Sequence, residues 1–199
     1  MRTLDTAVLI DELQRKLKDQ LHQLADFRSM GPAVLMQRPS PERWSINEIC
    51  EHINLSSGHY FKLLRKVYND PKSRLRYRST FTPGRFGEMS VNAMQPSQSG
   101  TINWKMKTMG MFEPRNAATK GLKSLDELRS MLEGMIELLH VARKRGIEGE
   151  KITSTLGPIL RFRTGDAFRF PIAHQERHFL QMQRTLDAVQ RMAAVKERA

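Results

Sequence analysis

The sequence predicts an all-α protein built as an antiparallel four-helix bundle. Four stretches of the 199-residue chain repeat apolar residues at intervals of three and four, which is the periodicity of amphipathic helices. No stretch shows a competing strand pattern, and there is no internal repeat. We therefore expect one domain over residues 1–199, in which the segment 69–121 forms a long connection between the second and third helices.

The first two helices are predicted from their apolar faces and from one capping sequence. The first covers about residues 6–26. Its apolar face consists of Ile10, Leu13, Leu17, Leu21 and Leu24. The second begins after Ser45, because Ser45 and Glu48 form a capping box in which each side chain accepts from a free backbone amide. It continues to about Tyr68.

The connection 69–121 combines helix breakers with basic and apolar residues. Its glycines and prolines argue against a continuous helix, and a long irregular segment in a compact domain usually indicates function or mobility. It holds nine basic and three acidic residues, so it supplies +6 of the net charge of +12. We expect Trp104 and some neighbouring methionines to pack against the bundle or a partner subunit, while the arginines between Arg74 and Arg85 face solvent.

The last two helices follow this connection. A second capping box, formed by Ser124 and Glu127, predicts a helix that runs to about Arg145. A fourth helix covers about residues 165–195, and Pro171 either kinks it or marks its true start.

Composition restricts the class of protein. No run approaches the ~18 apolar residues that a membrane-spanning helix needs. Asp11 and Glu12 precede any apolar region, so no secretory signal is expected. The single cysteine, Cys50, excludes an internal disulfide framework and a multi-cysteine zinc module. We expect a cytoplasmic protein without membrane contact, whose basic charge attracts anionic partners.

Two histidines on the fourth helix have the spacing of metal ligands. His174 and His178 lie four residues apart, which places both imidazoles on one helix face. A third ligand must come from another helix, for which His52 is the best candidate and His59 the reserve. The zincin motif is absent, because Glu176 points about 200° around the helix from His174. Glu48 either orients His52 or only caps its helix.

Several segments resemble the DinB/YfiT-like superfamily. Residues 44–53, W-S-I-N-E-I-C-E-H-I, are similar to its second helix, in which Trp-Ser precedes Glu and then a histidine. Residues 165–168, G-D-A-F, and 173–184, A-H-Q-E-R-H-F-L-Q-M-Q-R, resemble its last helix, in which a histidine precedes Arg-His, Gln and Arg. M-F-E-P at 111–114 resembles a segment before its third helix. The resemblance extends over about residues 5–190.

The resemblance implies an up-down-down-up four-helix bundle, often dimeric, with a divalent metal ion bound by His52, His174 and His178. Three imidazoles suit several metals, of which we expect zinc or nickel. Members of this family include thiol-dependent S-transferases and a mycothiol-dependent isomerase, so a low-molecular-weight thiol is a candidate cofactor. A homodimer and a small-molecule substrate are expected on the same ground.

The favoured function is therefore that of a metal-dependent enzyme, either a thiol-dependent S-transferase or a hydrolase. A three-histidine metal ion with an open position generates a nucleophile at neutral pH, and the basic connection would help to retain an anionic substrate. Two alternatives stay open. One is a non-catalytic protein that binds nucleic acid or another anion, although no nucleic-acid-binding motif is present. The other is a family member that keeps the bundle without a metal.

Overall fold

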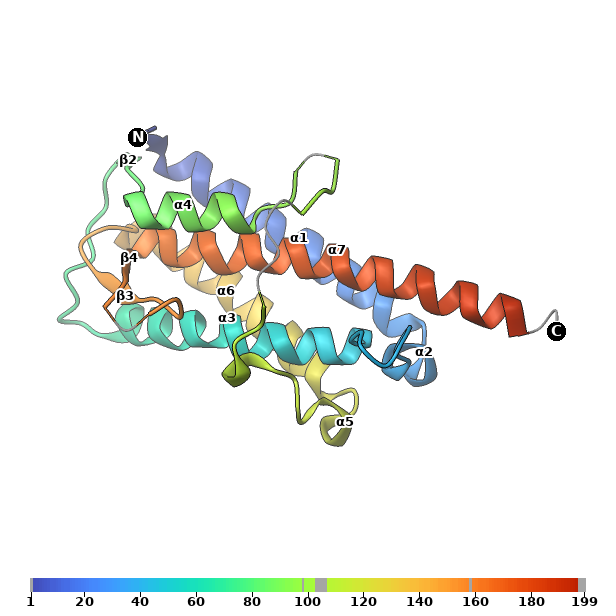
Figure 1. The fold of residues 1–199 in the computed structure, drawn as a ribbon. Coiled ribbons are helices and arrows are strands. Elements are labelled where there is room, and N and C mark those ends of the chain that lie inside the picture. The colour runs from blue at the N-terminus through green and yellow to red at the C-terminus, as the bar shows by residue number, and fades with distance from the viewer. Residues whose placement is uncertain (1, 98, 103–106, 158, 197–199) are drawn as a thin grey trace.

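The structure, a computed structural model, describes residues 2–97, 99–102, 107–157 and 159–196, and helices dominate it (Figure 1). The elements in chain order are β1 (Leu4–Asp5), α1 (Thr6–Ser29), α2 (Pro32–Met36), α3 (Ile46–Asn69), β2 (Thr80–Phe81), α4 (Arg85–Met94), the 3₁₀ helix η1 (Gly110–Phe112), α5 (Ala117–Lys120), α6 (Lys123–Arg145), β3 (Lys151–Thr153), β4 (Arg161–Arg163) and α7 (Thr164–Lys196). The all-α class is confirmed.

Four long helices pack around a common core. α3 lies against α6 and α7, and α1 lies against the same two helices. In Figure 1, α1 and α7 run in one direction, whereas α3 and α6 run in the opposite one. Leu17, Leu64, Leu132 and Phe179, one from each helix, are fully or almost fully buried in a single apolar cluster. The three-and-four periodicity of each helix therefore supplies one side of this core.

The two predicted capping boxes have different outcomes. The box before α3 is present, since the Ser45 hydroxyl accepts from the Glu48 amide at 3.2 Å and the Glu48 carboxylate accepts from the Ser45 amide at 2.9 Å. The box at Ser124 was wrong. α6 begins at Lys123 without a side-chain cap, and Ser124 instead donates to the buried carboxylate of Glu51 at 3.0 Å.

The fourth long helix includes its proline. α7 begins at Thr164, seven residues before Pro171, so Pro171 does not mark its start. Two short antiparallel strand pairs, β1–β2 and β3–β4, were not expected from the sequence. Strands of two or three residues are too short to show an alternating apolar pattern.

The connection after α3 is more ordered than the sequence suggested. It contains α4, a ten-residue helix that starts after Gly84 and packs on α7 through Gly87, Val91 and Met94. A side chain at Gly87 would collide with Asp166 of α7, which explains why glycine is tolerated inside this helix. The expectation of an irregular segment was therefore wrong for α4, because Pro83 and Pro96 flank a stretch just long enough for a short helix.

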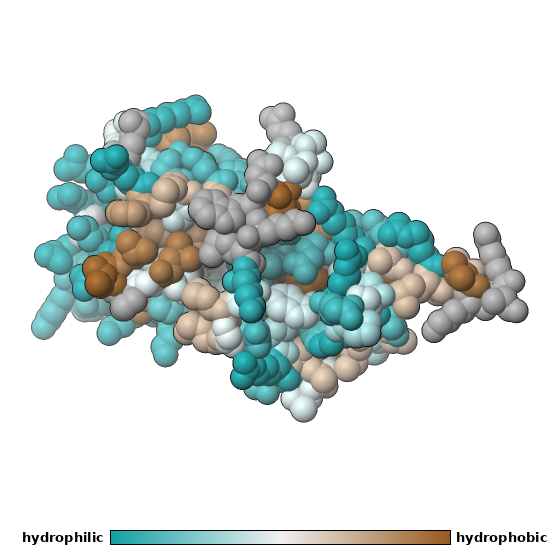
Figure 2. All heavy atoms as spheres, in the orientation of Figure 1, coloured by the Kyte–Doolittle hydropathy of each residue, from teal (hydrophilic) through white to brown (hydrophobic). Residues whose placement is uncertain are grey.

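The described basic residues of this connection lie outside the core. Arg74, Arg76, Arg78 and Arg85 are exposed, as predicted. Figure 2 shows hydrophilic side chains projecting from the end of the molecule around which the segment before α4 runs. Trp104, whose packing was predicted, lies outside the described residues.

The neighbouring methionines divide between core and surface. Met94 is buried, whereas Met109 and Met111 are 39% and 72% exposed. Of the helices in the described ranges, none has the length together with the apolar character that crossing a bilayer requires.

Candidate metal centre

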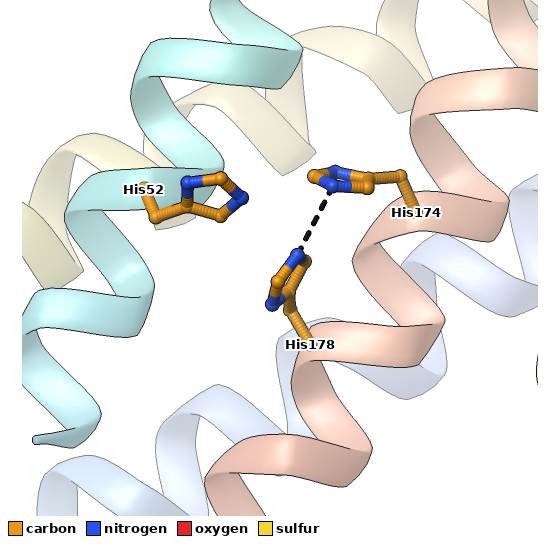
Figure 3. Close-up of side chains that lie close together, drawn as sticks. All are labelled: His52, His174 and His178. Atoms are coloured by element: carbon orange, nitrogen blue, oxygen red, sulfur yellow. Dashed lines mark hydrogen bonds between the residues drawn. The ribbon is translucent and has the colours of Figure 1, made fainter. Parts of the chain in front are cut away.

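Three histidines meet between α3 and α7 (Figure 3). His52 lies in the second turn of α3, and His174 and His178 lie one turn apart on α7. Each offers one ring nitrogen, and these three atoms all lie within 4.8 Å of one another. The Nε2 atoms of His174 and His178 are 3.0 Å apart. The structure thus brings together the three residues that the sequence selected.

The other histidines lie elsewhere. His59, the reserve ligand, has its Nε2 atom 2.9 Å from the carbonyl oxygen of Thr153 and is not part of the cluster. His22 and His140 are exposed.

Hydrogen bonds behind two of the rings fix their tautomers. The Nδ1 atom of His52 lies 2.8 Å from the carbonyl oxygen of Phe112, and Nδ1 of His178 lies 2.8 Å from Oε1 of Gln181. Both partners are oxygen acceptors, so each Nδ1 carries the proton. The Nε2 atom of each neutral ring is then unprotonated, and in Figure 3 the two rings present it to the same space.

The third ring completes a donor set that fits a divalent cation. With the lone pair of His178 Nε2 facing it, His174 Nε2 donates the single proton shared between them. Once that proton moves to Nδ1 of His174, a cation at this point would meet three imidazole nitrogens, which are preferred ligands of first-row divalent metals. The residues therefore fit the three-histidine metal site that the resemblance implies.

The surroundings keep the rings neutral. Burial lowers the pKa of His52, His174 and His178. At His174 and His178, repulsion from the other imidazolium forms and from the Arg177 guanidinium adds to this effect, and together these causes lower the pKa of His174 to about 3. Neutral imidazole is the form that binds a metal, so at neutral pH no proton has to be removed from a charged ring.

Comparison with known families agrees with this geometry. The model of the DinB superfamily matches residues 13–182, which include all three histidines. The chain belongs to the DinB superfamily. Comparisons with curated proteins and with solved structures found no match.

In this DinB superfamily member, neither of the glutamates considered in the sequence analysis, Glu48 and Glu176, positions a histidine ring. Glu48 caps α3 and binds Arg38, so the hypothesis that it orients His52 was wrong, and the backbone of Phe112 takes that role. Glu176 pairs with Lys16 of α1 at 3.0 Å, which confirms that it points away from the cluster.

One buried carboxylate beside the cluster supports the fold. Glu51 precedes His52 and is only 2% exposed. It accepts hydrogen bonds from the Lys120 ammonium at 2.8 Å and from the Ser124 hydroxyl at 3.0 Å. These contacts link α3 to α5 and α6 at the turn of α3 that carries His52.

Two hollows border the histidines. A cavity of about 90 Å³ is lined by all three histidines, Arg177 and residues of α3. A larger one of about 670 Å³ lies next to it and shares Arg177 and His178 as lining residues. The indole of Trp44 lines the larger cavity, and its ring centre is 5.0 Å from that of His52.

Three contributors to the site were not selected from the sequence. Arg177 and Gln181 lie three and seven residues after His174, so helical spacing alone places them on the histidine face. The carbonyl of Phe112 left no signal, because every residue carries that group and only the fold brings this one to His52.

Proposed function

We propose that this protein is a divalent-metal-dependent enzyme acting on a small substrate, with the metal held by His52, His174 and His178. The observation that carries the proposal is the convergence of three neutral imidazoles, two of which are oriented by acceptors behind them. A zinc or nickel ion bound there would act as a Lewis acid and lower the pKa of a bound water or thiol.

The chain itself would position the ligands and the substrate. Phe112 and Gln181 hold two rings in the tautomer that presents Nε2. The cavity of about 90 Å³ gives a substrate group access to the same space. Within this proposal the reaction is a thiol-dependent S-transfer or a hydrolysis, on the strength of the resemblance to family members with such activities.

We also infer the up-down-down-up bundle, which the helix directions in Figure 1 support. The homodimer, the cytoplasmic location and the thiol cofactor stay predictions.

Metal analysis tests the proposal directly. Mass spectrometry of protein purified without a histidine tag should find one zinc or nickel ion per chain. His178→Ala should abolish this stoichiometry and leave the helical circular dichroism unchanged, because a core of this size does not need a metal to fold. His140→Ala, which removes an exposed histidine of α6, is the control and should retain the metal.

Two results would contradict the proposal. A wild-type protein that takes up no metal would refute the site, and loss of helical signal on chelation would show a structural site instead of a catalytic one. Thiol consumption with a chloro-aromatic electrophile, measured with and without metal, then tests the proposed reaction.

A further inference from the structure

The described lining of the cavity beside the histidines carries positive charge only. Its described lining includes two cationic side chains, Arg177 and Lys107, and no aspartate or glutamate. Among the described lining residues, an anion in this cavity would therefore meet only positive or neutral groups.

Arg177 is the more buried of the two cations. It lies on α7 between His174 and His178 and is partly buried. Its Nη1 atom is shielded from solvent and has no hydrogen-bond partner among the described residues, and no described carboxylate pairs with it. Arg169, two turns earlier on the same helix, is also partly buried and shows the usual arrangement, since its guanidinium pairs with Glu88 and Asp166.

A second unsatisfied donor lines the same cavity from the opposite helix. The hydroxyl of Ser57 on α3 is buried and has no partner within the described part of the chain. Its neighbour Ser56 donates to the carbonyl of His52 at 2.8 Å, so the lack of a partner is particular to Ser57. A buried donor without an acceptor is destabilising, because it has lost its hydrogen bond to water. Two such donors around one cavity indicate a ligand that accepts from both.

We propose that this cavity binds an oxyanion group of the substrate, a carboxylate or a phosphate, with Arg177 as the main binding residue and Ser57 as an additional donor. The planar guanidinium matches either group with two parallel hydrogen bonds. About 90 Å³ accommodates one small charged group, and the remainder of the substrate would extend into the adjoining cavity of about 670 Å³. Assigning this anion to the substrate rests on the proposed function, whereas anion binding itself does not.

Titration of the metal-free protein tests the inference apart from the metal. Sodium acetate and inorganic phosphate would be titrated separately at constant ionic strength, with calorimetry and the NMR signal of the Arg177 Nε–H group as readouts. One of the two should bind saturably, which identifies the class of anion, and neutral acetamide should not. Arg177→Gln should weaken the binding at least tenfold and Ser57→Ala about threefold. Arg191→Gln makes the same charge change at an exposed position of α7 and should have no effect.

Metal content measured on the same variants separates the two proposals. Arg177→Gln should still bind one metal ion per chain. Unchanged anion affinity in this variant, or no saturable binding of either anion to the wild type, would overturn the anion site and leave the metal site standing. Absence of metal from the wild type would overturn the proposed function, and the titration of the metal-free protein would still decide on Arg177. If Arg177→Gln does not fold, Arg177→Lys keeps the charge without the planar fork and should lose affinity several-fold.

Discussion

Glu51 and Arg177 are both buried or partly buried charges next in sequence to a histidine of the candidate metal centre, but their surroundings differ. Glu51 is held by Lys120 and Ser124. The buried Nη1 atom of Arg177 has no partner among the described residues. Removal of an ion from water is costly unless a counter-charge or hydrogen bonds replace the water. The first charge is therefore part of the fold, and the second is best explained by a ligand.

Lowering the pH should have the largest effect on the unfolding free energy, because protonation of the histidines adds positive charge next to Arg177. Each buried imidazole has a lower pKa in the folded than in the unfolded chain, so the unfolded chain binds more protons below pH 6.5. The neutral histidines make their full contribution to the unfolding free energy above pH 6.5. This contribution is lost as the pH falls toward about 3. From pH 7 to 5 the metal-free protein should lose about 2 kcal/mol of unfolding free energy through His174. Protonation of His178, whose pKa is also lowered, should reduce the stability further.

Urea denaturation at several pH values measures this loss. His174→Gln should show a shallower dependence on pH than the wild type. An equal slope in both would mean that His174 is not the titrating group.

Breaking the ion pair between Lys120 and Glu51 should have the next largest effect on the unfolding free energy. Lys120→Met leaves the Glu51 carboxylate buried with only Ser124 as partner, and we expect a loss of about 3 kcal/mol in unfolding free energy at pH 7. Lys18→Met, at an exposed position of α1, is the control and should change stability by less than about 0.5 kcal/mol. Similar losses in both variants would show that the Glu51 network does not stabilise the fold.

Ser124→Ala should have a smaller effect, because Lys120 remains with Glu51. Loss of one hydrogen bond to a charged group predicts a decrease of about 1.5 kcal/mol. Thermal unfolding checks this value, and a double-mutant cycle with Lys120→Met should show non-additivity, since both residues contact the same carboxylate. Additive effects would argue against a shared network.

Replacing Arg177 should change stability least, and in the opposite direction. Arg177→Met removes a charge that has no described counter-ion and keeps much of the side-chain volume, so the unfolding free energy should stay the same or rise by up to about 1 kcal/mol. Chemical denaturation of this variant beside Lys120→Met tests the comparison itself. A loss of about 3 kcal/mol in both would show that Arg177 is a structural charge.

Local patterns in the sequence predicted the long helices and part of the candidate site. The end of α6 at Arg145 and the capping box at Ser45 depend on neighbouring residues, which the sequence displays. His174 and His178 were recognisable because a helix brings positions four apart together.

Contacts between distant segments account for what the sequence did not predict. Ser124 has the surroundings of a helix cap, but its partner Glu51 is 73 residues away and competes for the same hydroxyl. The Phe112 carbonyl reaches His52 across 60 residues and depends on backbone position alone. α4 was missed because the glycines and prolines of the whole connection obscured a short helix within it.

Arg177 lies between two proposed ligand histidines, so α7 sets the distance between its guanidinium and the proposed metal site. On a continuous helix, the separation between the guanidinium and the two imidazoles is limited by the fixed rise of about 1.5 Å per residue and by side-chain length. A substrate that engages both must carry its negative group at a matching number of bonds from the atom that reacts. Selection by substrate length would then reside in the five residues 174–178 of one helix.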